Sequence, residues 1–99
     1  PERALDGDPL ARAALRDEVA VPLHAAGGGV LETVRAVLSS GGNLEASART
    51  IFVHPNTVRY RLKRAADITG LSVTDPRGGW TLQVALALAH LDQERSLWD

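Results

Sequence analysis

The side chains best suited to chemistry in this sequence are cations concentrated in one stretch. Residues 46–66 contain no Asp or Glu, and their basic residues are Arg49, Arg59, Arg61, Lys63 and Arg64. The rest of the 99-residue chain holds the remaining six basic residues and all twelve acidic ones, although the formal net charge is only −1. A basic block in an acidic body is typical of a site that meets a polyanion. For an isolated basic run, a solvated helix face is the commoner explanation.

The spacing in this stretch favours contacts with DNA bases. On a helix that begins at Pro55, residues three and four apart share a face, which groups four side chains: Asn56, Arg59, Tyr60 and Lys63. Apolar residues occupy the opposite, buried side: Val58, Leu62 and Ala65. Arg bonds guanine through two hydrogen bonds, so Arg59 and Lys63 are the main candidates for base contacts. Thr57 stands beside them in the first turn.

Three further cations lie on the flanks of the helix: Arg49, Arg61 and Arg64. They are predicted to bind phosphates, with structural ion pairs as the alternative. Asn56 is suited either to bonding adenine or to bonding backbone in its own turn. Tyr60 can contact a phosphate or pack against a neighbour. His54 can contact a phosphate or cap the turn.

Two short helices joined by a tight turn must position these side chains. Asn43 is suited to cap the first, which is predicted over residues 43–52. Its predicted buried stripe consists of Leu44, Ala48, Ile51 and Phe52. Pro55 interrupts this helix and starts the next, and Val53 is expected to pack against Val58 and fix the angle between the two. A helix pair whose second member is basic and outward-facing predicts a helix-turn-helix, with the second helix in the DNA major groove.

The other elements are also predicted to be helices. The apolar stripe of residues 30–38 belongs to a helix that Gly41 and Gly42 end. A segment over residues 80–91 is apolar almost all round, which is typical of a helix that is central in its domain or shared with a partner. A weakly patterned helix is expected from Asp8 to a break at Pro22. The fold class is therefore all-α, a bundle of four to five helices containing a helix-turn-helix.

The run Gly27-Gly28-Gly29 predicts a flexible joint and a division of the chain. Residues 1–26 are expected to be an N-terminal helical segment or a linker to upstream domains, and residues 27–99 the helix-turn-helix domain. The sequence begins at Pro1 and contains no Met, which indicates a piece of a longer protein.

Several classes of function are disfavoured. The chain has no Cys, and its three histidines lack metal-ligand spacing, so no metal and no cofactor are expected. No nucleophile with a base and no phosphate-binding loop is present, so an enzyme is not expected. No apolar run reaches membrane-spanning length and no signal peptide is present, which predicts a cytoplasmic protein without a membrane partner.

The most specific pattern is HPNTVRYRL at residues 54–62, preceded by GNLEASAR at residues 42–49 and followed by TGL at residues 69–71 and DP at residues 75–76. Over about residues 30–91 the chain resembles the C-terminal helix-turn-helix domain of PucR-family bacterial transcription regulators, and the helix pair is similar in layout to the Fis type. The resemblance implies a reading helix over residues 55–66 and a supporting helix over residues 43–52. The chain departs from the family pattern at Gly78-Gly79, where the family's last helix usually begins with charged residues.

The sequence thus predicts the sequence-specific DNA-binding output domain of a bacterial transcriptional regulator. Its expected partner is double-stranded DNA, bound as a homodimer on half-sites roughly 34 Å or a multiple apart. The resemblance implies that an effector binds to upstream domains. Two alternatives are a Fis-like architectural protein that bends DNA, and a helical protein-interaction module whose basic helix docks on an acidic partner.

Overall fold

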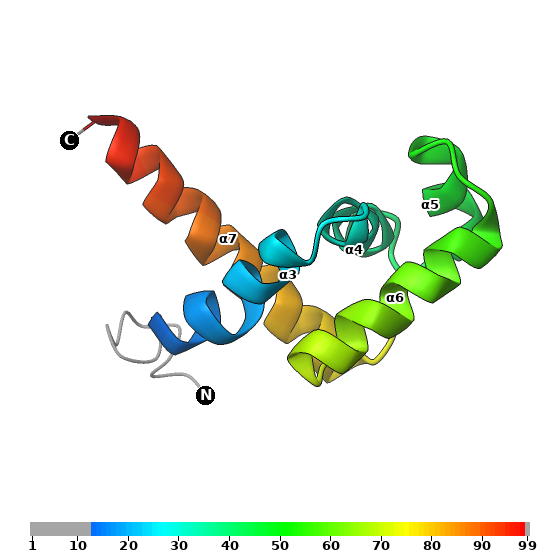
Figure 1. Ribbon diagram of the computed structural model, residues 1–99, viewed down its shortest axis with the longest axis horizontal. Helices are drawn as coiled ribbons and strands as arrows, with labels where there is room; N and C mark the ends of the chain where they lie inside the picture. Colours follow the sequence, from blue (N-terminus) through cyan, green and yellow to red (C-terminus); the bar gives the residue numbers. More distant parts are fainter. Residues whose placement is uncertain (1–12, 99) are drawn as a thin grey trace.

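The computed structural model describes residues 13–98, and every regular element within that range is a helix (Figure 1). In chain order they are η1 (Arg16–Ala20), α3 (Val21–Ala26), α4 (Val30–Ser39), α5 (Leu44–Thr50), α6 (Pro55–Thr69) and α7 (Pro76–Trp98). The predicted all-α fold with a helix-turn-helix is confirmed. Among the described residues, no helix combines the length and the hydropathy needed to cross a membrane.

The first described helix continues through Pro22 instead of ending there. Residues 13–15 are α-helical, and η1 is a π-helical segment in which the N–H of Val21 bonds to the carbonyl of Arg16. Proline removes an N–H donor and crowds the carbonyl four residues before it. The wider turn of η1 stands directly before the proline and accommodates it, so α3 follows with Pro22 in its first turn. The predicted break at Pro22 is therefore wrong, and the predicted start at Asp8 lies outside the described residues.

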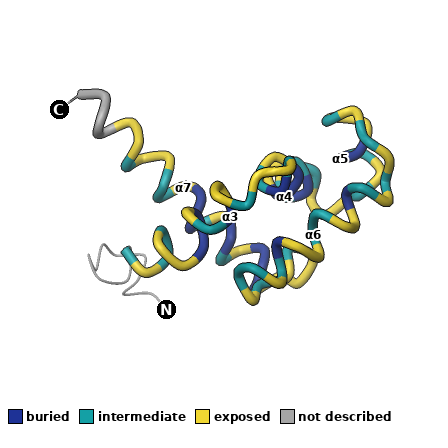
Figure 2. Tube along the Cα trace, viewed as in Figure 1, coloured by how far each residue is buried: buried dark blue, intermediate teal, exposed yellow. Residues whose placement is uncertain are grey.

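The larger hydrophobic cluster joins η1 and α3 to α4, α6 and α7. Its buried members are Val19, Ala20, Leu23, Val30, Val34, Ala65, Leu82, Ala85 and Leu86. Figure 2 follows this burial along the chain, and the element contacts place α7 beside η1. Of the two alternatives for the apolar last helix, the buried side chains of Leu82, Ala85 and Leu86 support a central place in the domain, and a contact with a partner stays a prediction.

A smaller cluster attaches the helix-turn-helix to α4. Its buried members are Val37, Ala48 and Val58, one each from α4, α5 and α6. Leu62 packs against both clusters and is half-buried, where the sequence pattern predicts a buried side chain. Helix α6 is thus attached at two places along its length, at Val58 and at Ala65.

The last helix begins directly at Pro76. The Asp75 carboxylate accepts a hydrogen bond from the N–H of Gly78 at 2.9 Å, and the Asp75 carbonyl accepts one from the N–H of Gly79 at 2.7 Å. Both glycines are buried, and a side chain at either would collide with the backbone of residues 72–73. Gly78 and Gly79 therefore lie inside the helix, where they permit a close approach of the preceding loop.

The three glycines before α4 form a turn in which each has a positive φ. Residues on both sides of the turn, Leu23 and Val30, belong to the same cluster. The division of the chain at residue 27 stays a prediction, and its first part includes residues 1–12, which the structure does not describe.

Replacement of Leu23 by alanine tests whether α3 is an integral part of this core. Because Leu23 is fully buried, Leu23→Ala is expected to lower the free energy of unfolding by about 2–5 kcal/mol, measured by urea denaturation followed by circular dichroism. The exposed neighbour Val21 supplies the control, since Val21→Ala is expected to stay within about 0.5 kcal/mol of the parent. Equal effects of the two substitutions would contradict the packing described above.

Candidate nucleic-acid interface

Asn43 caps α5, the first helix of the helix-turn-helix, as predicted. The Asn43 Oδ1 accepts a hydrogen bond from the N–H of Ala46 at 2.9 Å. The buried hydroxyl of Ser47 donates to the Asn43 carbonyl at 2.7 Å, which fixes the first turn of α5. Ala48 is buried in the smaller cluster, and its small side chain lets α5 and α6 approach each other closely. Arg49 is exposed at the end of α5.

The turn between the helices differs from the prediction at Phe52. Phe52 has a φ of 59° and is 93% exposed, so it does not belong to the buried stripe of α5. The N–H of Val53 bonds to the carbonyl of Ala48 at 3.0 Å, which is a helix-ending pattern with a left-handed residue after the cap. Because the helix ends at Thr50, the helical spacing that predicts burial no longer applies to Phe52.

Three consecutive residues fix the start of α6. The His54 Nδ1 accepts a hydrogen bond from the N–H of Asn56 at 3.0 Å, so His54 caps the helix. Pro55 occupies the first helical position, where its missing N–H has no cost. Val53 packs against the cluster that contains Val58, as the predicted staple requires. Two roles were expected for His54, a phosphate contact or a cap, and the structure shows the cap.

The side of α6 opposite the core is polar and exposed over its first turns. Its residues, here called the reading face, are Asn56, Arg59, Tyr60 and Lys63, and all four are exposed. Beneath them, Val58 and Ala65 are buried. The Arg59 Nη1 donates a hydrogen bond to the Asn56 Oδ1 at 2.9 Å. The Asn56 side chain thus has a partner that the sequence analysis did not consider, although the spacing of three residues is one at which helical side chains meet.

Arg61 lies on the other side of the helix and contacts α4. Its Nη1 donates to the hydroxyl of Thr33 at 3.3 Å, and its guanidinium occupies the space that a side chain at Gly29 would need. Thr33 is fully buried and donates in turn to the Gly29 carbonyl at 2.8 Å. Arg61 therefore links α6 to the start of α4, and its predicted contact with phosphate has no support from this geometry.

The remaining predicted contacts lie at the edges of the reading face. Arg64 is exposed and Thr57 is half-buried. Asp67 is exposed on the same side of α6 four residues after Lys63, and it is the first acidic residue after Glu45. The helical spacing of Asp67 from Lys63 is visible in the sequence and indicates this end of the cationic surface. The cationic part of α6 therefore ends before its last turn.

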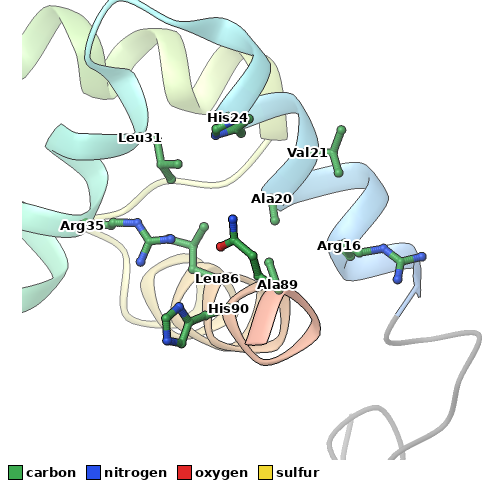
Figure 3. Close-up of a pocket in the computed structure, with 10 residues that line it drawn as sticks. Arg16, Ala20, Val21, His24, Leu31, Arg35, Leu86, Ala89 and His90 are labelled. Carbon is green, nitrogen blue, oxygen red and sulfur yellow. The ribbon is translucent and has the colours of Figure 1, made fainter. Parts of the chain in front are cut away.

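A groove of about 260 Å³ lies between η1, α3, α4 and α7, and none of its lining residues belongs to α5 or α6 (Figure 3). Arg16 at its edge pairs with Asp17 at 3.0 Å and with Asp92 at 3.3 Å, and these carboxylates raise the pKa of Arg16 above its usual value. The His90 Nε2 lies 3.1 Å from the Glu94 Oε1. Two of the groove's four basic side chains, Arg16 and His90, thus have acidic neighbours, whereas no ion pair among the described residues involves a cation of α5 or α6.

No group of His, Cys, Asp and Glu side chains within residues 13–98 is arranged to hold a metal ion. The candidate site is the exposed cationic surface of the helix-turn-helix. Residues 30–88, which run from the start of α4 into α7, match the family model of the PucR C-terminal helix-turn-helix domain. The chain belongs to this family. The family and the regulators related to it make the chain a DNA-binding regulatory output domain.

Relatives of known and unknown role support this placement. An uncharacterized protein of Mycobacterium tuberculosis is 52% identical over 93% of this chain and 22% of its own length. The purine catabolism regulatory protein of Bacillus subtilis is 32% identical over 63% of this chain and 12% of its own length. The crystal structure of a regulator of polyketide synthase expression from Bifidobacterium adolescentis superposes with a TM-score of 0.87 at 46% identity, covering 93% of this chain and 39% of that one. The chain thus spans about a fifth of the mycobacterial relative.

The left-handed conformation of Phe52 predicts that glycine stabilises this position. An L-residue in that conformation costs roughly 1–2 kcal/mol and glycine avoids most of it, while the exposed ring loses no packing. Phe52→Gly is expected to raise the free energy of unfolding by about 1 kcal/mol after the added freedom of the unfolded chain is subtracted. Phe52→Ala keeps the Cβ atom and is the control, with little expected change in urea denaturation. Equal stabilities of the alanine and glycine variants would contradict the conformation.

Proposed function

We propose that this domain binds double-stranded DNA sequence-specifically, with the first turns of α6 in the major groove. The observation that carries the proposal is the reading face: four exposed polar side chains on a helix whose opposite side is buried. The major groove is about 12 Å wide and admits one helix, whose outward side chains then reach the base edges. The rigid attachment of α6 to α4 and α5 supports its use as a probe of fixed orientation.

The charges along α6 favour one orientation in the groove. Asn56 and Arg59 lie in the N-terminal half and Lys63 just past the middle, whereas Asp67 lies roughly 16 Å beyond Asn56 along the axis. A carboxylate close to phosphates is repelled. The helix therefore enters with its N-terminal half and points its last turn away from the backbone.

The exposed residues divide into two roles. Arg59 and Lys63 contact bases, with Tyr60 and the half-buried Thr57 at the borders of the same contact. Arg49 and Arg64 contact phosphates on either side. His54 accepts a bond at Nδ1, so the neutral imidazole carries its proton on Nε2, which can donate to a phosphate oxygen. Arg61 is omitted because it bonds Thr33.

One helix-turn-helix covers only a few base pairs, so we propose that two copies act together on half-sites about 34 Å or a multiple apart. A second apolar stripe of α7 supports α7 as the contact between copies. Trp80 and Leu91 are 47% and 49% exposed, and Val84 and Leu88 between them are half-buried. The relatives are several times longer than this chain, so an effector acts through parts of the regulator outside it.

Selection of bound duplexes from a random pool tests the function directly. A recovered motif, repeated at a spacing of one helical turn or a multiple, is the expected result, and sedimentation of the complex gives the number of copies bound. Equal affinities for selected and random duplexes would instead favour the DNA-bending alternative. Negligible binding of every duplex at low salt would favour a protein-interaction module.

Substitution of two exposed arginines separates base contacts from phosphate contacts. Arg59→Ala is expected to relax the preference at one base pair, at a cost of about 1–3 kcal/mol for the preferred duplex. Arg64→Ala is expected to weaken binding to all duplexes alike and to reduce the slope of log affinity against log salt by about 1. Fluorescence anisotropy with matched duplexes measures both effects. Identical behaviour of the two variants would remove the distinction between the roles.

A further inference from the structure

Two side chains of the reading face, Arg59 and Asn56, are joined by a hydrogen bond. The Arg59 Nη1 lies 2.9 Å from the Asn56 Oδ1, and both side chains are exposed. The two side chains differ in the number of conformations that each can adopt. Asn56 is short and stands in the first turn of α6, where its N–H bonds to His54 Nδ1, whereas Arg59 is long and reaches into solvent. The shorter side chain, which is attached to backbone that the cap holds, therefore restricts where the guanidinium of the longer one lies.

The bond also limits what each side chain can do at a base edge. Two-point recognition of adenine by Asn requires its Oδ1 to accept from the adenine amino group, and here the Asn56 Oδ1 uses one of its two lone pairs to accept from Arg59, which turns the oxygen toward the guanidinium. The guanidinium retains further N–H donors, because only one of those on Nη1 is used. A pair of donors held in a fixed plane matches the O6 and N7 acceptors of guanine.

We propose that Asn56 is a positioning residue that holds the Arg59 guanidinium in the orientation that reads guanine, and does not itself read adenine. The inference rests on the proposed function, because it assigns Asn56 a role only if Arg59 contacts a base. It predicts that the preference for one base pair depends jointly on Asn56 and Arg59.

The experiment uses the 99-residue chain and two duplexes that differ at the base pair whose preference Arg59→Ala removes. Asn56→Ala is expected to reduce the preference at this same base pair several-fold. The double variant, Asn56→Ala with Arg59→Ala, is expected to be no less selective than Arg59→Ala alone. Non-additivity of this kind identifies two residues that act as one unit.

Asn56→Asp is the matched conservative variant. The carboxylate keeps an acceptor for Arg59 but loses the amide donor that adenine recognition needs. It is expected to retain the preference at the Arg59 base pair while it weakens binding to both duplexes, since it adds a negative charge near phosphates. Unchanged thermal unfolding of the three single variants checks that the helix is intact, as Asn56 and Arg59 are both exposed.

The possible failures are distinguishable. If Arg59→Ala leaves every base preference unchanged, the proposed reading role of Arg59 fails and the positioning role fails with it. If Arg59→Ala acts but Asn56→Ala has no effect on selectivity, the bond at 2.9 Å is a surface contact and only the positioning role is overturned. The same holds if Asn56→Ala alters a different base pair, or if Asn56→Asp is as unselective as Asn56→Ala.

Discussion

The packing of Val53 against the small cluster that contains Val58 determines the geometry of the whole exposed surface. These side chains pack in the cluster that contains Ala48, so the residue before the cap and the fourth residue of α6 hold the turn closed. A helix that started one residue earlier or later would rotate its side chains by about 100° around its axis. Such a rotation would carry cations toward α4 and apolar residues toward solvent. The small cluster thus decides which side chains a ligand meets.

The cations of the groove beside α7 and those of α6 differ in whether they have acidic partners. The groove beside α7 has arginine and histidine, but acidic neighbours accompany Arg16 and His90 there. On α6, the cations of the reading face have no acidic partner among the described residues, and Arg61 turns inward to a neutral hydroxyl. A chain with a net charge of −1 therefore concentrates unpaired positive charge on one helix.

Most of the fold was predictable because it depends on local rules. The cap at Asn43, the proline start of α6 and the left-handed Gly70 at its end all occur where residue types require them. The errors arise where a helix is irregular. Hydrophobic periodicity assumes a uniform turn, so it does not reveal the π-helical segment before Pro22 or the left-handed Phe52.

Side-chain partners were less predictable than helices. Thr33 and Arg61 are 28 residues apart, and only the packing of α4 on α6 brings them together. Gly29 was interpreted as part of a joint, whereas it also provides room for a guanidinium. The exposure of Arg59 and Lys63 followed from the pattern, but the bond from Arg59 to Asn56 depends on side-chain conformations that no pattern specifies.

Leu62 stands near the middle of α6, where the two hydrophobic clusters meet. A helix held at a single point can pivot about it, but one held at two points along its length cannot tilt without opening a void at either end. The angle of α6 relative to the helices beneath it consequently depends on both clusters together. A substitution in the larger cluster, where α7 packs, is therefore expected to change that angle, as a change in the turn would.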